Sequence, residues 1–229
     1  MTLLCLLATE PELRAGMASP EGWLTPTEQA RLQSLGTAAR RDSFLAGRWL
    51  ARRAVQRWLG TDEPPALEVA DSGACRVAGM AGVAGVHVSI SHSAGVVACA
   101  VCGVPVGIDV EGLARPRDHL ALAEAVHDTA QRERLAALPG DARALAFLQL
   151  WTLKEAWLKA RGQGLDFALM RSLAFEAADQ VDPLGDVAVA QVEGLVLAIA
   201  ADPALPLRIE GLADVVWQRS RTRRQGWAT

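Results

Sequence analysis

The sequence predicts an α+β fold made of two halves, because two long helical segments alternate with short strand-like ones. The helical segments are residues 38–59 and 141–161, one in each half. The chain has 229 residues, enough for one large domain or two small ones. We place the boundary so that residues 1–105 form the first half and residues 106–229 the second, without a flexible linker.

The first half is predicted to begin with a strand at residues 2–7 and a helix at residues 25–35. Thr25, followed by Pro26 and Glu28, is typical of a capped helix start. The long helix at residues 38–59 has an apolar stripe beside six arginines and ends at Gly60. Strand-like segments then follow at residues 67–69, 75–77, 86–90 and 96–102.

The second half is predicted to begin with a buried strand at residues 104–110. A helical stretch at residues 117–138 precedes the long helix at residues 141–161, which ends at Gly162. The remaining strands are expected at residues 173–176, 187–192, 195–201 and 215–219.

Composition indicates an ordinary globular protein, with 51% hydrophobic residues, 21% charged residues and a net charge of −3. Nothing in this balance favours a nucleic-acid partner, and no apolar run is long enough to span a membrane. The apolar start is short and lacks a basic leader, and the four cysteines have no disulfide framework spacing. We therefore expect a cytoplasmic protein with reduced, structural cysteines.

Acidic and basic side chains interrupt apolar sequence at two places. Asp109 and Glu111 point to the same side of the strand at residues 104–110, because side chains alternate along a strand. Two neighbouring carboxylates are tolerable if a divalent cation such as Mg²⁺ lies between them. On the helix at residues 141–161, Glu155 and Lys159 are four apart and share one face, so a third carboxylate can join the pair.

Three motifs in order make the sequence specific: SISHS at residues 89–93, GIDVE at residues 107–111 and WTLKEAWLKARGQGL at residues 151–165. Together with Phe44–Arg48 and Arg52, they resemble the surfactin-type 4′-phosphopantetheinyl transferases, in the branch marked by W and KEA. The resemblance covers about residues 40–175.

The resemblance implies a pseudo-dimer of two similar α+β halves with the active site in the cleft between them. It also implies an enzyme that uses Mg²⁺, or Mn²⁺, to move the 4′-phosphopantetheine arm of coenzyme A onto a serine of an apo acyl or peptidyl carrier protein. Adenosine 3′,5′-bisphosphate would be released. By motif match, Asp109, Glu111 and Glu155 are the expected metal ligands. The expected catalytic residues are Asp109, Glu155 and Lys159, with Glu155 acting as metal ligand, base or both.

Coenzyme A contacts are expected from both halves. An arginine fork suits its 3′-phosphate, and Arg41 and Arg48, seven apart on one helix face, are the candidates, with Arg52 as an alternative. The full set expected to bind coenzyme A is Arg41, Arg48, Ser91, His92, Lys154, Lys159 and Gly164.

Two other functions are compatible with these motifs: a Mg²⁺-dependent phosphoesterase acting on coenzyme A, and a non-catalytic module that binds coenzyme A or a carrier protein. Because the three carboxylates and Lys159 are all present, the second alternative is disfavoured. Residues 71–75 replace a Gly-Lys-Pro turn common in the family, so contacts to adenine are open. A chain with two halves has no need to dimerise around its site, and we expect a monomer. The arginines predicted to steer an acidic carrier protein are Arg115, Arg117, Arg132 and Arg134.

Overall fold

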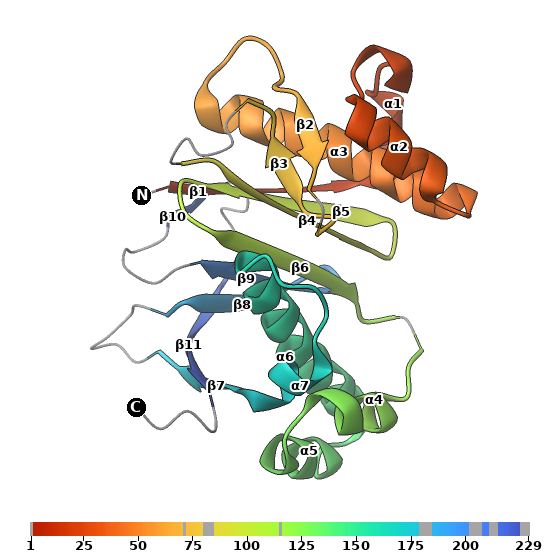
Figure 1. The fold of residues 1–229 in the computed structure, drawn as a ribbon. Helices are drawn as coiled ribbons and strands as arrows, with labels where there is room; N and C mark the ends of the chain where they lie inside the picture. Colours follow the sequence, from red (N-terminus) through yellow and green to blue (C-terminus); the bar gives the residue numbers. More distant parts are fainter. Residues whose placement is uncertain are drawn as a thin grey trace.

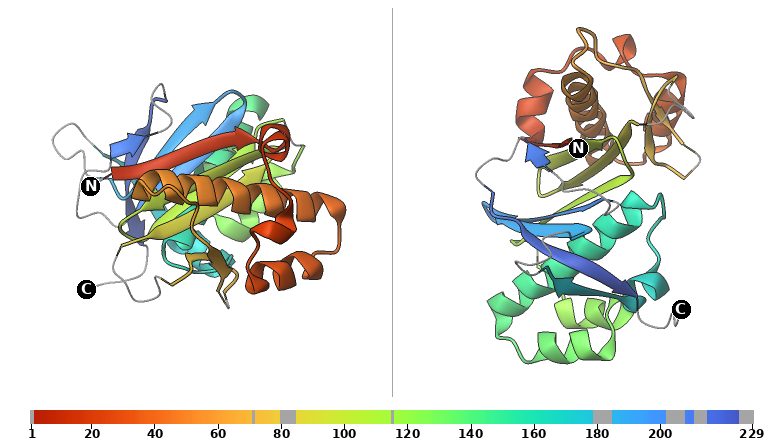
Figure 2. Two further views of the ribbon diagram at one scale, coloured as in Figure 1. Left: turned by 90° about the horizontal axis from the view of Figure 1, so that it is seen from above. Right: turned by 90° about the vertical axis from the view of Figure 1, so that its left-hand side faces the viewer.

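The computed structural model has four layers, a helix, two sheets and a second helix, as Figures 1 and 2 show. It describes residues 2–70, 72–79, 85–114, 116–178, 185–201, 208–210 and 215–224. Within these ranges the predicted α+β fold is confirmed. Each half of the chain contributes one long helix that packs on the outer face of one sheet.

The first sheet has the strand order β10-β1-β5-β4. Its strands are β1 (Thr2–Thr9), β4 (His87–Ser93), β5 (Val96–Cys102) and β10 (Arg208–Glu210). Helix α3 (Ala38–Leu59) covers its outer face, with α1 (Glu10–Ala15), a short 3₁₀ helix (Pro20–Gly22) and α2 (Pro26–Ser34) beside it. A small hairpin of β2 (Leu67–Val69) and β3 (Cys75–Val77) lies next to α2 and α3.

The second sheet has the strand order β6-β9-β8-β11-β7. Its strands are β6 (Val106–Gly112), β7 (Leu173–Ala177), β8 (Val187–Val192), β9 (Leu195–Ala201) and β11 (Gln218–Arg224). Helix α6 (Gly140–Ala160) crosses its outer face, and α4 (His119–Val126), α5 (Thr129–Ala136) and α7 (Phe167–Ser172) surround that helix.

The inner faces of the two sheets share one apolar core. Leu3 and Cys5 of β1 pack with Ile108 and Val110 of β6 and with Leu197 of β9, and all five are buried. Since burial of apolar area is the main favourable term in folding, this core holds the two sheets together.

Two cysteines of β5 lie in different apolar cores. Cys99 belongs to the core under α3, whereas Cys102 belongs to the core between the sheets, so the two lie on opposite faces of β5. Together with Cys5 and Cys75 they are free thiols, as expected.

One strand crosses the predicted boundary at residue 105. Strand β10, from the second half of the sequence, pairs in parallel with β1, with Thr2 opposite Arg208 and Leu4 opposite Glu210. The first sheet is therefore completed by a segment that is distant in sequence.

The two long helices have nearly the predicted bounds, but the helical stretch expected at residues 117–138 is wrong. It is divided into α4 and α5 because Asp128 caps a new helix, its side chain accepting a hydrogen bond from the Gln131 N–H at 2.7 Å. The last strand begins at Gln218 and not at residue 215. Helices α1 and α7 and strand β10 were not predicted.

Candidate active site

Strand β6 and helix α6 pack against each other and carry the acidic and basic side chains of the site. Gly107 is the contact point, because it has no side chain to separate the strand from the helix backbone at Ala156. Glu155 and Lys159 flank Ala156, and Asp109 lies two residues after Gly107. The contact therefore brings the three charged side chains together.

Asp109 is the centre of this group and is only 3% exposed. Its Oδ1 accepts hydrogen bonds from Lys159 Nζ at 2.6 Å and from Ser91 Oγ at 2.7 Å. Lys159 Nζ also donates to Ser91 Oγ at 3.1 Å. Burial raises the pKa of Asp109, while the ammonium group of Lys159 and its hydrogen bond act in the opposite direction.

Glu155 completes the cluster from the same helix. Its Oε2 lies 3.6 Å from Lys159 Nζ. Burial, and then the negative charge of Asp109, raise the pKa of Glu155 to about 7. Burial alone would lower the pKa of Lys159, but the carboxylates of Asp109 and Glu155 raise it, so the amine stays charged between them.

Glu111 lies on the same side of β6 as Asp109, since both contact side chains of the neighbouring strand β4. Glu111 Oε2 accepts a hydrogen bond from Ser93 Oγ at 2.8 Å and from the Arg117 guanidinium at 2.6 Å. Arg117 is thus an ion-pair partner inside the site and differs from the surface arginine we predicted.

Two basic side chains, Lys159 and Arg117, form ion pairs with the carboxylates of this cluster. Within the ranges that the structure describes, no three acidic, cysteine or histidine side chains form a ready metal-binding group. The residues nevertheless suit a hard cation, because Asp109 Oδ2 is buried without a hydrogen-bond partner and the nearby donors are carboxylate oxygens.

Two adjoining cavities extend from this cluster along the first half. The first has a volume of about 250 Å³, and Lys159 lies on its wall opposite the turn at residues 72–75. The second has a volume of about 360 Å³ and is lined by His92 of β4. Arg48, Gly73 and Ile90 line both, so the two cavities share one wall. Gly162 and Gly164 close the first cavity beyond the end of α6.

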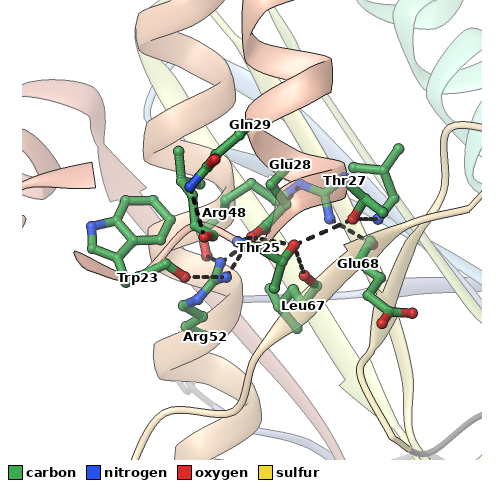
Figure 3. A network of polar contacts seen from close by, with 11 residues as sticks. Trp23, Thr25, Thr27, Glu28, Gln29, Arg48, Arg52, Leu67 and Glu68 are labelled. Atoms are coloured by element: carbon green, nitrogen blue, oxygen red, sulfur yellow. Dashed lines mark hydrogen bonds and ion pairs between the residues drawn. The ribbon is translucent and has the colours of Figure 1, made fainter. Parts of the chain in front are cut away.

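Arg48 is held by a buried polar network, which Figure 3 shows. Its NH1 group donates to the Glu68 carbonyl at 3.2 Å, and its Nε lies 3.9 Å from Glu28 Oε1. Arg52 donates to both oxygens of the fully buried Glu28 and to the Trp23 carbonyl. Arg52 is therefore an ion-pair partner of Glu28, and of these two arginines Arg48 is the one that lines the cavities.

The structure does not bring two of the predicted residues to this site. Arg41 donates to the Leu35 carbonyl at 2.7 Å at the end of α2 and lines neither cavity. Lys154 is fully buried on another face of α6, where its Nζ contacts the Val126 carbonyl, His127 Nδ1 and Gln131 Oε1 at 2.7–2.8 Å. Burial lowers the pKa of Lys154 to about 7. Its contacts connect α6 to the end of α4, to His127 and to α5.

Further predictions concern His92 and two of the arginines expected to steer a carrier protein. His92 lines the second cavity beside Arg48, and burial lowers its pKa. Arg132 donates to Thr129 on α5, while Arg115 lies outside the described residues.

Comparison with known proteins assigns this arrangement to a family. The sequence profile of the 4′-phosphopantetheinyl transferase superfamily matches residues 105–193, which contain β6 and α6. The chain is 30% identical over 172 residues to the 4′-phosphopantetheinyl transferase HetI of Nostoc, a match that covers 71% of this chain and 73% of HetI. The chain belongs to the 4′-phosphopantetheinyl transferase superfamily.

Other phosphopantetheinyl transferases match over shorter ranges. The identity is 37% over 83 residues with psf-1 of Bacillus pumilus and 35% over 83 residues with Sfp of Bacillus subtilis. These matches cover 36% of this chain, and 35% and 36% of the two relatives. None of the helices in the described part of the chain is long and apolar enough to cross a membrane.

Several residues on the walls of the two cavities were not among those predicted from sequence. Arg31 and Arg40 line the second cavity together with Arg48, and Ser72–Cys75 line the first. The arginines belong to a helix pair with many basic residues, so sequence alone does not separate them from solvated neighbours. For Ser89 and Ser93 the signal was present, because serine repeats with the period of a strand in SISHS.

Proposed function

We propose that this protein transfers the 4′-phosphopantetheine arm of coenzyme A to a serine of an apo acyl or peptidyl carrier protein. The observation that carries the proposal is that Lys159, bonded to Asp109, lies on the wall of the same cavity as Arg48. One extended ligand in this cavity could therefore place its pyrophosphate at Lys159 and its ribose phosphate near Arg48. Family membership supports the same reaction.

The proposed cofactor contacts follow the two cavities. Arg48, assisted by Arg40 and His92, would bind phosphate groups of coenzyme A, because guanidinium groups donate two charge-assisted hydrogen bonds. The backbone at Gly164 would lie against the cofactor in the first cavity. Arg41 and Lys154 have no part in this proposal.

In the proposed reaction the serine oxygen forms a bond to the β-phosphorus of coenzyme A, and the bond from that phosphorus to the bridging oxygen breaks. Adenosine 3′,5′-bisphosphate leaves with the bridging oxygen and its electron pair. Lys159 would neutralise negative charge that develops on the phosphate oxygens. Glu155, whose pKa is raised to about 7, would accept the serine proton directly or through a water molecule.

We further propose that Asp109, Glu111 and Glu155 hold Mg²⁺, or Mn²⁺, when coenzyme A is bound. The buried, unpartnered Asp109 Oδ2 supports this assignment. When bound, the cation would supply charge neutralisation to the phosphates. Lys159 and Arg117 must then give up part of their contact with Asp109 and Glu111.

One incubation tests the function. The protein, coenzyme A and Mg²⁺ are mixed with an apo carrier protein, and the carrier is weighed by mass spectrometry. A gain of one phosphopantetheine group supports transfer. Release of phosphopantetheine without carrier modification would instead support a phosphoesterase, and no turnover with intact coenzyme A binding would support a non-catalytic module.

We also propose that the protein acts as a cytoplasmic monomer. Its four free cysteines suit a reducing compartment, and both halves of the site come from one chain. Light scattering after size-exclusion chromatography tests the monomer directly.

A further inference from the structure

Three serines of β4 connect this strand to β6, although the two strands belong to different sheets. Ser89 Oγ accepts a hydrogen bond from the Ile108 N–H at 3.0 Å, Ser91 Oγ from the Val110 N–H at 3.3 Å and Ser93 Oγ from the Gly112 N–H at 3.3 Å. We call these three residues the serine row. The constant offset means that β4 and β6 run in the same direction, and serine side chains replace the backbone carbonyls of an ordinary strand pair.

Two members of the serine row have a second contact. While accepting from β6, Ser91 Oγ donates to Asp109 Oδ1 at 2.7 Å, and Ser93 Oγ donates to Glu111 Oε2 at 2.8 Å. The equivalent partner of Ser89 would be Gly107, which has no side chain. Ser89 therefore has the contact between strands but no carboxylate to orient.

A hydroxyl held from both sides has little rotational freedom. The N–H group of β6 fixes the position of the serine oxygen. The hydroxyl proton of Ser91 or Ser93 then points to one oxygen of the carboxylate and fixes its orientation. Ser91 is 7% exposed and Asp109 is 3% exposed, so water competes little for these bonds. The other oxygen of this carboxylate, Asp109 Oδ2, is buried and has no hydrogen-bond partner.

From this geometry we propose that Ser91 and Ser93 are positioning residues that orient Asp109 and Glu111 for a divalent cation. The proposal rests on the proposed function, and it gives Ser91 a role other than the expected contact to coenzyme A. Partners that orient the ligands of a metal typically change its affinity by 10–100-fold when removed. The serine row thus couples the first half of the protein to the metal-binding strand of the second.

The test measures Mn²⁺ binding directly, by the electron paramagnetic resonance signal of the free ion, in the presence of coenzyme A. We expect Ser91→Ala and Ser93→Ala to weaken binding by about tenfold or more. Ser89→Ala is the matched control, because it removes the same kind of bond to β6 without touching a carboxylate. Ser89 also lines the first cavity, so coenzyme A is kept at a saturating concentration for every variant, and the Mn²⁺ affinity of Ser89→Ala should then equal that of the wild type. Ser93→Thr keeps the hydroxyl and should restore the affinity.

Thermal unfolding of all four variants separates positioning from folding. The proposal is supported if the alanine variants of Ser91 and Ser93 lose affinity while unfolding at the temperature of Ser89→Ala. Equal affinity in the three alanine variants would overturn it. If the wild-type protein with coenzyme A binds no Mn²⁺, the proposed metal-dependent transfer fails and the role of the serines fails with it.

Discussion

Gly107 lies so close to Ala156 that a Cβ atom at residue 107 would be 1.9 Å from the Ala156 carbonyl oxygen. A second backbone atom, the Ala160 nitrogen, would be 2.5 Å away. Backbone atoms cannot turn aside as a flexible side chain can. The glycine of the GIDVE motif therefore sets the distance between β6 and α6, and with it the contact between Asp109 and Lys159.

Gly107→Ala should both destabilise the fold and reduce activity. The added methyl group must push α6 away from β6, and overpacking of this kind costs about 3 kcal/mol. Urea unfolding measures the loss. Gly103→Ala is a suitable control, because a Cβ there would have its nearest contacts at 3.7 Å, which is an ordinary distance. Equal unfolding midpoints for the two variants would contradict the prediction.

Asp109→Asn should abolish most of the transfer while the protein stays folded. The amide has nearly the shape of the carboxylate, but it lacks the charge that pairs with Lys159 and that the proposed divalent cation requires. We expect a fall in kcat of roughly a hundredfold or more, equivalent to about 3 kcal/mol of lost stabilisation. Carrier mass spectrometry measures the rate, and circular dichroism checks the fold. Wild-type rates in a folded variant would remove Asp109 from the mechanism.

The raised pKa of Glu155 should make the stability of the protein depend on pH when divalent cations have been removed. Its pKa is raised from 4.5 to about 7, so the folded state holds a proton that the unfolded state releases. The stabilisation from this proton is complete below pH 4.5 and is lost as the pH rises through about 7. Its size is on the order of 1–3 kcal/mol.

The comparison with Glu155→Gln isolates this effect, because the glutamine cannot titrate. As the pH rises from 4.5 to about 7, the unfolding free energy of the wild type should fall relative to that of Glu155→Gln. A difference that does not change with pH over this range would show that Glu155 keeps an ordinary pKa.

Lys154→Met should lower stability without changing the KM for coenzyme A. The methionine fills similar space but leaves the Val126 carbonyl without its donor, and it leaves Gln131 Oε1 with only the longer hydrogen bond from the Asp128 N–H at 3.4 Å. An unsatisfied buried group costs about 1–3 kcal/mol. Urea unfolding and steady-state kinetics on the same sample give both numbers. A tenfold rise in KM at unchanged stability would return Lys154 to the cofactor site.

Arg48→Ala should raise the KM for coenzyme A more than the KM for dephospho-coenzyme A, which lacks the 3′-phosphate. Loss of a charge-assisted contact costs about 1.5–3 kcal/mol, or roughly 10–100-fold. Arg52→Ala provides the contrast, since it leaves the buried Glu28 carboxylate without its bidentate partner and should act on stability first. An equal effect of Arg48→Ala on both substrates would place the 3′-phosphate elsewhere.

Local signals in the sequence predicted much of the fold. The long helix α3 begins after Thr37 and ends at Gly60, whose φ of 67° is one that glycine adopts readily, and both bounds were predicted. Asp128 is also a helix-capping residue, but the prediction of a single helical stretch at residues 117–138 did not take it into account. Strand β10 has only three residues and depends on a partner far away in sequence, so no local pattern indicates it.

The candidate site was predictable where helix and strand periodicity applied. Glu155 and Lys159 share a helix face, and Asp109 lies opposite them across the contact at Gly107. Lys154 was misplaced because the motif lists it beside Glu155, whereas one residue along a helix turns the side chain by about 100° to a face that here packs on α4 and α5. Which face of a helix buries a lysine depends on tertiary packing, and a sequence does not carry that information locally.

The parallel pairing of β10 with β1 has a mechanical consequence. The chain passes from the first sheet to the second between β5 and β6, returns to the first sheet at β10 and enters the second sheet again at β11. Three such crossings, the shared apolar core and the serine row all oppose separation of the two sheets about a single hinge. We therefore expect the distance between the two sheets to stay nearly the same when a ligand binds in the two cavities.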